Sequence, residues 1–162
     1  MKRLSKVIGG VAGIAGMAVI LATAPSCKKS SYSNNTGSDS IVAYSGTMVK
    51  SSGDVTSAAT GSVTATYKPG SGMLSYSVNW SGLSGPPTLV TINDGTPPSA
   101  PIISTLQSVP MDTTATLSGD VKLTSDQAND LGAGKVFVQV ATAKWPNGEI
   151  YAMLTKPTHS GY

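Results

Sequence analysis

The 162-residue sequence has few of the side chains on which catalytic and cross-linking chemistry depends. It contains one cysteine and one histidine, and charged residues make up only 12% of it. A single cysteine excludes a disulfide within the chain. The single histidine, His159, lies three residues from the C-terminus. A Ser-His-Asp triad would have to use this histidine beyond the last predicted strand, a poor place for a base that must lie about 3 Å from its partner.

An excess of positive charge is also missing from most of the chain. The formal net charge is +3, but Lys2, Arg3 and Lys6 are three of the 11 Lys and Arg residues. The chain from Cys27 onward contains eight basic and eight acidic residues. No basic stripe is interleaved with aromatic residues, so the sequence does not predict a nucleic-acid partner.

The first 26 residues have the order of a lipoprotein-type signal peptide. Basic positions precede an apolar run at 7–24, and Cys27 follows Ala24-Pro25-Ser26. A basic start, an apolar run and small residues before a cleavage point are typical of secretory signals. Cys27 stands where a bacterial lipoprotein signal places its acylated cysteine. We therefore expect a lipid on Cys27 that holds the protein at the cell envelope, whether at the outer membrane, in the periplasm or on the surface. The alternatives are a free thiol and an uncleaved apolar helix.

The rest of the chain divides by composition into three parts. Residues 27–40 are rich in Ser and Asn and poor in apolar residues, so they predict a flexible tether. Residues 41–156 are numerous enough for one domain with its own core. Residues 157–162 form a C-terminal tail.

Alternation of apolar and polar residues dominates the predicted domain. It predicts strands with one buried face at 62–67, 74–80, 136–141 and 150–154. Turn sequences at 68–72, 85–87 and 145–148 separate such runs. Short strands at this spacing indicate an all-β, antiparallel sandwich. Trp80 shares its strand face with Leu74, Tyr76 and Val78, so we expect it in the core.

One segment has helical rather than strand character. Thr124 and Gln127 have the spacing of a capping box at a helix start. Ala128 and Leu131 then share one face, and Gly132 can end the helix. A single short helix between two strands is predicted.

A series of short stretches, taken in order, resembles the CHRD (chordin-type) domain of secreted bacterial proteins. The matching stretches are ATG at 59–61, GMLSYSV at 72–78, SGLSGP at 81–86, LTSDQA at 123–128, VFVQVAT at 136–142 and WPNGEI at 145–150. This resemblance implies a Greek-key antiparallel β-sandwich of the immunoglobulin-like or superoxide-dismutase-like kind.

The resemblance also indicates where a metal site would lie. Bacterial members often carry His-x-His after the Gly-Leu-Ser-Gly-Pro turn and a further histidine late in the penultimate strand. The matching positions here are Thr91, Asn93 and Ala141. Neutral Thr and Asn oxygens do not replace imidazole for zinc or copper. We therefore expect no metal, no other cofactor and no catalytic residue, and interpret 88–95 as a plain strand and turn.

The acidic residues are weaker candidates for a metal site. Most of them adjoin Gly, Ser or Thr, so we expect them either to stabilise turns or to be solvated, and this includes Glu149. Asp94 with Asp112 or Asp120 is the one combination that could converge on a hard cation such as Ca²⁺.

Trp145 is the candidate ligand contact. It precedes Pro-Asn-Gly at a predicted hairpin tip, where an exposed indole could stack on a sugar ring or a protein partner. The sequence predicts a non-enzymatic cell-envelope lipoprotein with a binding, adhesive or structural role and a protein or glycan ligand. The alternatives are a metal-binding or superoxide-dismutase-like protein and a carbohydrate-binding module that uses Trp145.

Overall fold

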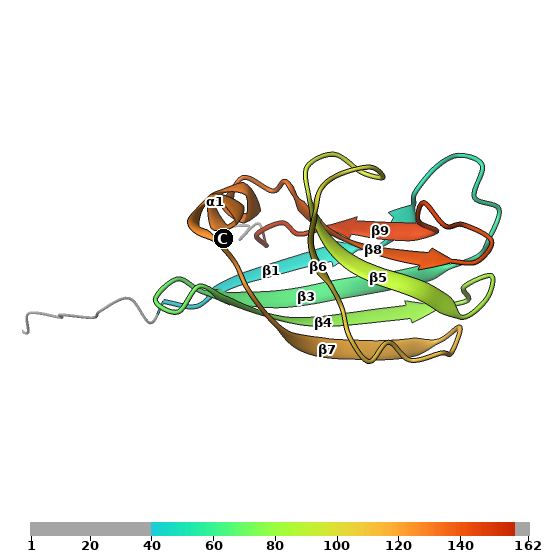
Figure 1. Ribbon diagram of the computed structural model, residues 1–162, viewed down its shortest axis with the longest axis horizontal. Helices are drawn as coiled ribbons and strands as arrows, with labels where there is room; N and C mark the ends of the chain where they lie inside the picture. The colour runs from blue at the N-terminus through green and yellow to red at the C-terminus, as the bar shows by residue number, and fades with distance from the viewer. Residues whose placement is uncertain (1–39, 158–162) are drawn as a thin grey trace, which may run out of the picture. The chain divides into compact units, whose positions relative to one another are not determined.

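Two antiparallel sheets pack face to face in the computed structural model, which describes residues 40–157 (Figure 1). The first sheet has the order β1-β3-β4-β7, with bounds Val42–Thr47, Thr60–Lys68, Met73–Ser81 and Ala115–Lys122. The second sheet has the order β2-β9-β8-β5-β6, with bounds Val49–Lys50, Ile150–Met153, Val136–Thr142, Pro87–Asp94 and Ile102–Thr105. The predicted all-β sandwich is confirmed.

The connections between the sheets are of the Greek-key type. β4 pairs with β7 and β5 pairs with β8, although two strands intervene in the sequence in each case. The chain crosses from the first sheet to the second between β4 and β5 and returns between β6 and β7. A strand that returns beside an earlier one by a long connection is the mark of a Greek key.

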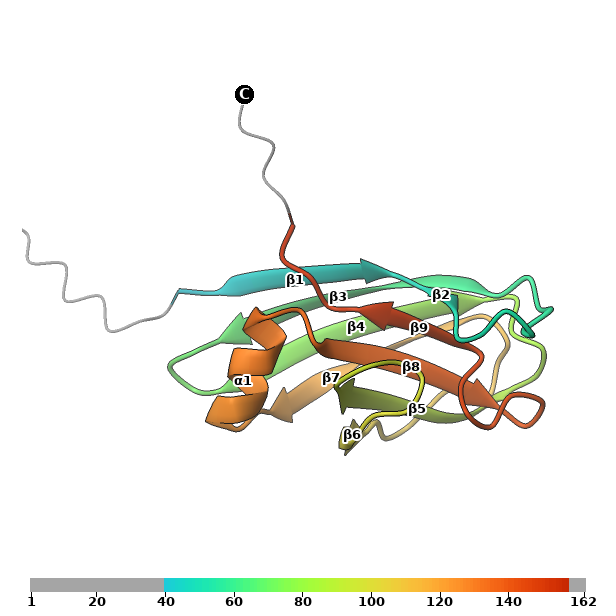
Figure 2. The ribbon, with the colours of Figure 1, turned by 90° about the horizontal axis from the view of Figure 1, so that it is seen from above.

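The N-terminal strand pair joins the two sheets at one edge. β1 belongs to the first sheet and β2 to the second, and the buried Met48 lies at the bend between them. Ser45 and Thr155 exchange backbone hydrogen bonds of 2.9 and 3.0 Å, which tie the segment after β9 to β1 (Figure 2). Gly46 permits this approach, since a Cβ there would lie 2.1 Å from the Met153 carbonyl oxygen.

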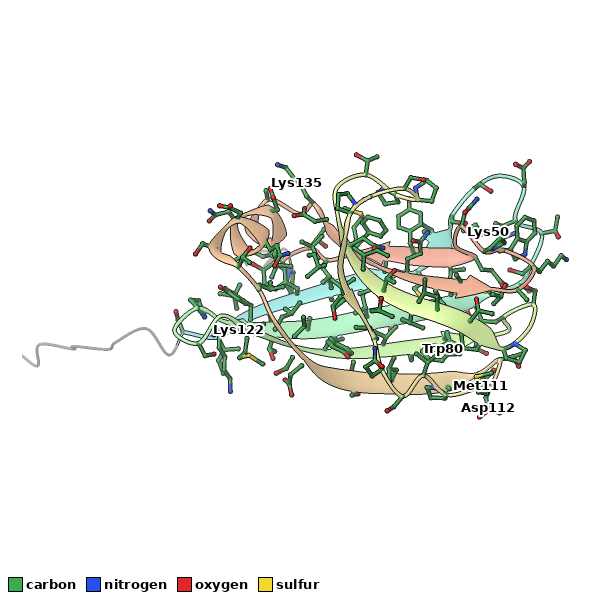
Figure 3. All side chains as sticks on the ribbon, in the orientation of Figure 1. Lys50, Trp80, Met111, Asp112, Lys122 and Lys135 are labelled. Atoms are coloured by element: carbon green, nitrogen blue, oxygen red, sulfur yellow. The ribbon has the colours of Figure 1, made fainter. Side chains whose placement is uncertain are left out.

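The core lies between the sheets and follows the predicted alternation. Inward residues of β3 and β4 pack against inward residues of β5 and β8; they include Val63, Ala65, Leu74, Tyr76, Val78, Val90, Ile92, Val138 and Val140. Trp80 is only 1% exposed, and its indole N–H donates to the Asp112 carbonyl at 3.0 Å (Figure 3). A large buried aromatic with its polar atom satisfied stabilises such a core strongly.

The short helix α1, Ser125–Gly132, forms as the sequence predicts. Thr124 is the N-cap, and Thr124 and Gln127 each accept a hydrogen bond from the other's backbone N–H. Leu131 is fully buried and contributes to the core. The helix closes one end of the sandwich in the connection from β7 to β8 (Figures 1 and 2).

The second sheet differs from the prediction in having two covered faces. Alternation in β8 predicts one buried face, but all seven of its residues are buried. The outer side chains Phe137, Gln139 and Ala141 are covered because loops fold back over the sheet, including the connection between β5 and β6 (Figure 2). Strand periodicity does not report the covering that a loop provides.

Several expectations concern residues outside the described range. The signal peptide (1–26) and nearly all of the tether (27–40) precede it, and the C-terminal tail (157–162) lies almost entirely beyond it. Within residues 40–157, no helix has the length and apolar character needed to cross a membrane.

Replacement of Trp80 by Ala should lower the free energy of unfolding by about 3–5 kcal/mol, because a large buried side chain leaves a cavity. Chemical denaturation measures this loss. Thr64→Ala, at an exposed position on the neighbouring β3, is the control and should change stability little. A loss below about 1 kcal/mol for Trp80→Ala would contradict the burial of this residue.

Candidate functional site

A row of buried polar side chains lies on the outer face of the second sheet. Thr91 and Asn93 on β5 are 3% and 2% exposed, and Gln139 on β8 is 9% exposed. Thr91 lies opposite Gln139 in the register, so all three side chains share one face. Buried polar groups remain stable only when they find hydrogen-bond partners.

The three side chains form a connected network. The Asn93 Nδ2 group donates to Thr91 Oγ1 at 3.0 Å and to Gln139 Oε1 at 3.4 Å. Gln139 Nε2 in turn donates to two backbone carbonyls, of Pro98 at 3.3 Å and of Asn147 at 2.8 Å. Gln139 therefore fastens the β5–β6 and β8–β9 loops to the sheet beneath them.

The structure brings the predicted site positions together. Thr91, Asn93 and Ala141 all line one cavity of about 170 Å³, with Gln139 beside them. The stretch 88–95 forms a strand and the start of a turn, as expected, but its polar residues Thr91 and Asn93 are buried under loops. Gln139, which belongs to no recognised site pattern, completes the set. Its signal in the sequence is a polar residue inside the otherwise apolar run VFVQVA.

The donor atoms at this position do not fit a zinc or copper ion. The Asn93 amide directs its N–H groups at the two neighbouring oxygens, Thr91 Oγ1 and Gln139 Oε1. The set offers a hydroxyl and amides, whereas these metals favour imidazole nitrogen and thiolate sulfur. No group of three His, Cys, Asp or Glu side chains converges within the part of the chain that the structure describes.

A second polar cluster surrounds the buried carboxylate of Glu149. Glu149 is 0% exposed, which corrects the expectation of a solvated turn position. Its Oε1 accepts the backbone N–H of Ser84 at 2.9 Å. Its Oε2 accepts the hydroxyls of Ser84 and Thr142, each at 2.7 Å. The cluster joins the β4–β5 connection to the end of β8 and the start of β9.

The pKa of Glu149 lies below its ordinary value despite burial. Burial alone raises the pKa, and the donors Thr142, Ser57 and Ser84 together outweigh it by stabilising the charged form. The Ser57 hydroxyl is buried beside the carboxylate, although its oxygen reaches no partner among residues 40–157 at ordinary hydrogen-bond geometry. Glu149 is thus a charged anchor that accepts three hydrogen bonds from Ser84 and Thr142.

Trp145 lies on the β8–β9 connection, close to both clusters. Its side chain is half-buried, and Lys144 Nζ lies 5.6 Å from the ring centroid. The indole lines a cavity of about 270 Å³ together with residues of the β2–β3 and β5–β6 loops. The predicted hairpin tip is confirmed, and its tryptophan contacts a concave surface.

The other predicted residues do not join these clusters. Burial and the neighbouring Asp130 raise the pKa of Asp94, so this carboxyl lies near Asp130 and Lys135, in contrast to the expected partners Asp112 and Asp120. Lys135 and Asp130 form an ion pair of 2.9 Å. Cys27 and His159 lie outside the described residues.

Comparison with protein-family models shows to which family this chain belongs. The family model described as CHRD domain matches residues 42–151, from β1 into β9. The chain belongs to the CHRD domain family. The match includes Thr91, Asn93, Gln139, Ala141, Trp145 and Glu149. Neither curated proteins nor solved structures yielded a match.

Membership of the CHRD family agrees with the observed sandwich and supports a binding-type domain. The family is not known for enzymatic activity. The two buried clusters of this CHRD domain fix loops in place, and loops held by a rigid scaffold commonly carry binding residues.

Substitution of Glu149 by Gln should lower the free energy of unfolding at pH 7 by about 1–3 kcal/mol, because hydrogen bonds to a charged acceptor are lost. The folded pKa is depressed below the ordinary value of 4.5. The stabilisation is therefore present above about pH 4.5 and is lost as the pH falls through the folded pKa. Chemical denaturation of the wild-type protein and of Glu149→Gln between pH 7 and pH 3 measures this effect. The difference between their free energies of unfolding should become smaller below about pH 4.5.

A matched variant, Asp112→Asn, removes an exposed carboxylate away from the cluster and should leave stability nearly unchanged. A Glu149→Gln difference that stays constant across this pH range would contradict the assignment of Glu149 as a charged anchor.

Proposed function

We propose that this CHRD-domain protein is a non-enzymatic lipoprotein of the cell envelope that binds a ligand with loops held against its second sheet. The observation that supports this most directly is the use of two buried polar clusters to fix loops. Gln139 holds the β5–β6 and β8–β9 loops, and Glu149 holds the β4–β5 connection. Loops fixed in this way present a preformed surface, which lowers the cost of ordering on binding.

The polar groups of this region are poorly suited to catalysis. Thr91, Asn93 and Gln139 use their polar atoms on one another and on loop carbonyls. The Glu149 carboxylate is fully buried and accepts three hydrogen bonds at 2.7–2.9 Å. A general base must lie within hydrogen-bond reach of a substrate proton, and the Glu149 side chain is 0% exposed.

The rival function is metal binding of the superoxide-dismutase-like kind. Elemental analysis of the purified full-length protein tests it directly. We expect far less than one zinc or copper per chain after incubation with either metal, because the cavity at Thr91, Asn93 and Ala141 supplies no imidazole or thiolate. One tightly held metal ion per chain would overturn the proposed function.

The proposed location depends on Cys27. The basic start, the apolar run and the cysteine support a lipid anchor, and three acyl chains on one residue would give stable attachment to a membrane. The protein would then contact the membrane through Cys27 and a protein or glycan ligand through its domain, with no nucleic acid involved.

Replacement of Cys27 by Ser should move the protein from the membrane fraction to the soluble fraction and abolish the mass added by lipid. Fractionation and mass spectrometry of the expressed full-length chain measure both effects. Ser31→Ala, in the predicted tether, is the matched control and should remain membrane-bound. Membrane retention of Cys27→Ser would favour an uncleaved helical anchor.

A further inference from the structure

The cavity next to Trp145 is assembled from three loops. Ser51, Ser52 and Asp54 come from the β2–β3 loop, Pro98 from the β5–β6 loop, and Trp145 with Pro146 from the β8–β9 loop. Its volume is about 270 Å³. It lies near the end of the sandwich away from α1, at the end where Figure 3 labels Lys50, the residue before Ser51. A concave site with a few polar groups among apolar ones is typical of small-ligand binding.

The walls of this cavity are held in place by the protein itself. The Trp145 backbone N–H donates to the Thr142 carbonyl at 3.1 Å, and the Gly148 N–H donates to the Trp145 carbonyl at 3.0 Å. The Ser51 N–H donates to the Glu149 carbonyl at 3.0 Å, and the Ser51 hydroxyl donates to the Gly148 carbonyl. The β2–β3 and β8–β9 loops are therefore bonded to each other beside the cavity.

Gln139 makes a further part of this wall. It bonds to the carbonyls of Pro98 and Asn147, which both border the cavity. Gly148 is adapted to this contact, since it has a φ of +108° and a Cβ there would lie 2.0 Å from Gln139 Nε2. A ligand that enters would find the three loops already positioned, so little conformational entropy would be lost on binding.

The indole N–H of Trp145 lacks a hydrogen-bond partner within the protein. Its Nε1 is buried, and no acceptor among the described residues bonds to it. A buried donor without a partner is destabilising, and a buried tryptophan N–H usually has one. Phenylalanine would supply a ring here without that cost. This points to a role for the indole in contact with a ligand, in addition to packing.

The lining selects the chemistry of the ligand. The indole and the prolines Pro98 and Pro146 offer apolar surface, whereas Asp54 and Ser52 offer oxygen atoms. A pyranose ring has the matching character, with a C–H face for the apolar surface and hydroxyls that donate to a carboxylate. The Asp54 carboxylate disfavours an anionic ligand, and Lys144 is directed at the indole ring.

We propose that the cavity formed by Trp145, Asp54, Ser52 and the two prolines binds a neutral pyranose residue of a glycan. This inference rests on the proposed function, because it names the ligand class of the same loops. A protein ligand bound by these loops outside the cavity would leave the proposed binding role intact while refuting the glycan site.

The test is a binding titration of the mature full-length protein in detergent. Glucose, galactose, mannose and N-acetylglucosamine are titrated separately while intrinsic tryptophan fluorescence is followed, and a glycan array extends the panel to oligosaccharides. Of the two tryptophans, Trp80 is in the core with its N–H bonded to a backbone carbonyl, so a change in emission would report Trp145. At least one neutral sugar should bind saturably.

Three variants distinguish direct contact with the sugar from an effect on the packing of the fold. Trp145→Ala should weaken sugar binding at least about tenfold. Trp145→Phe should also weaken it, while the free energy of unfolding stays equal or rises because the unpaired N–H is gone. Asp54→Asn should weaken binding severalfold, whereas the matched change Asp112→Asn, outside the cavity, should not.

Absence of saturable sugar binding by the folded wild-type protein would overturn the glycan site, as would unchanged affinity in Trp145→Phe and Asp54→Asn together. Binding confined to anionic sugars would also contradict it. Each of these results would leave the metal and membrane tests of the proposed function unaffected.

Discussion

A carboxylate without solvent exposure is stable in a protein interior only when hydrogen-bond donors replace water around it. Glu149 meets this condition with the backbone N–H and hydroxyl of Ser84 and the hydroxyl of Thr142. The donors come from the β4–β5 connection and from the end of β8. The charge therefore adds side-chain hydrogen bonds to the place where β5 begins beside the end of β8, next to the paired residues Pro87 and Thr142. The positions of the surrounding loops depend on it.

Gln139 has the same role on the outer face of β8, which points away from the core. Its amide bonds to Asn93 on the neighbouring strand and to the carbonyls of two loops. The outer face of β8 is covered as a result, and the sandwich gains a third, polar layer over part of its second sheet. Together the two side chains fix the loops of this CHRD sandwich, which border two adjoining cavities.

The cavity at Thr91, Asn93 and Ala141 lies where the family resemblance implied a metal site. This chain places a hydroxyl, an amide and a methyl group at these three positions. The strand geometry still brings the three positions together. The amide network occupies the donor positions with its own hydrogen bonds, so the region contributes to loop placement and does not suit a transition metal.

Local patterns in the sequence predicted β3, β4, β5, β8 and β9, the capping box of α1 and the burial of Trp80, because alternation and capping depend on residues close in the chain. They did not predict β1, β2, β6 or β7. They did not predict the burial of Glu149 or the importance of Gln139. These two residues look like a turn carboxylate and a strand polar residue, and their partners Ser84, Pro98 and Asn147 belong to other segments. The sequence by itself determined an antiparallel sandwich without histidines at 91, 93 and 141. Only the tertiary structure decided which polar side chains are covered and where Trp145 finds a cavity, since burial depends on contacts between loops distant in the chain.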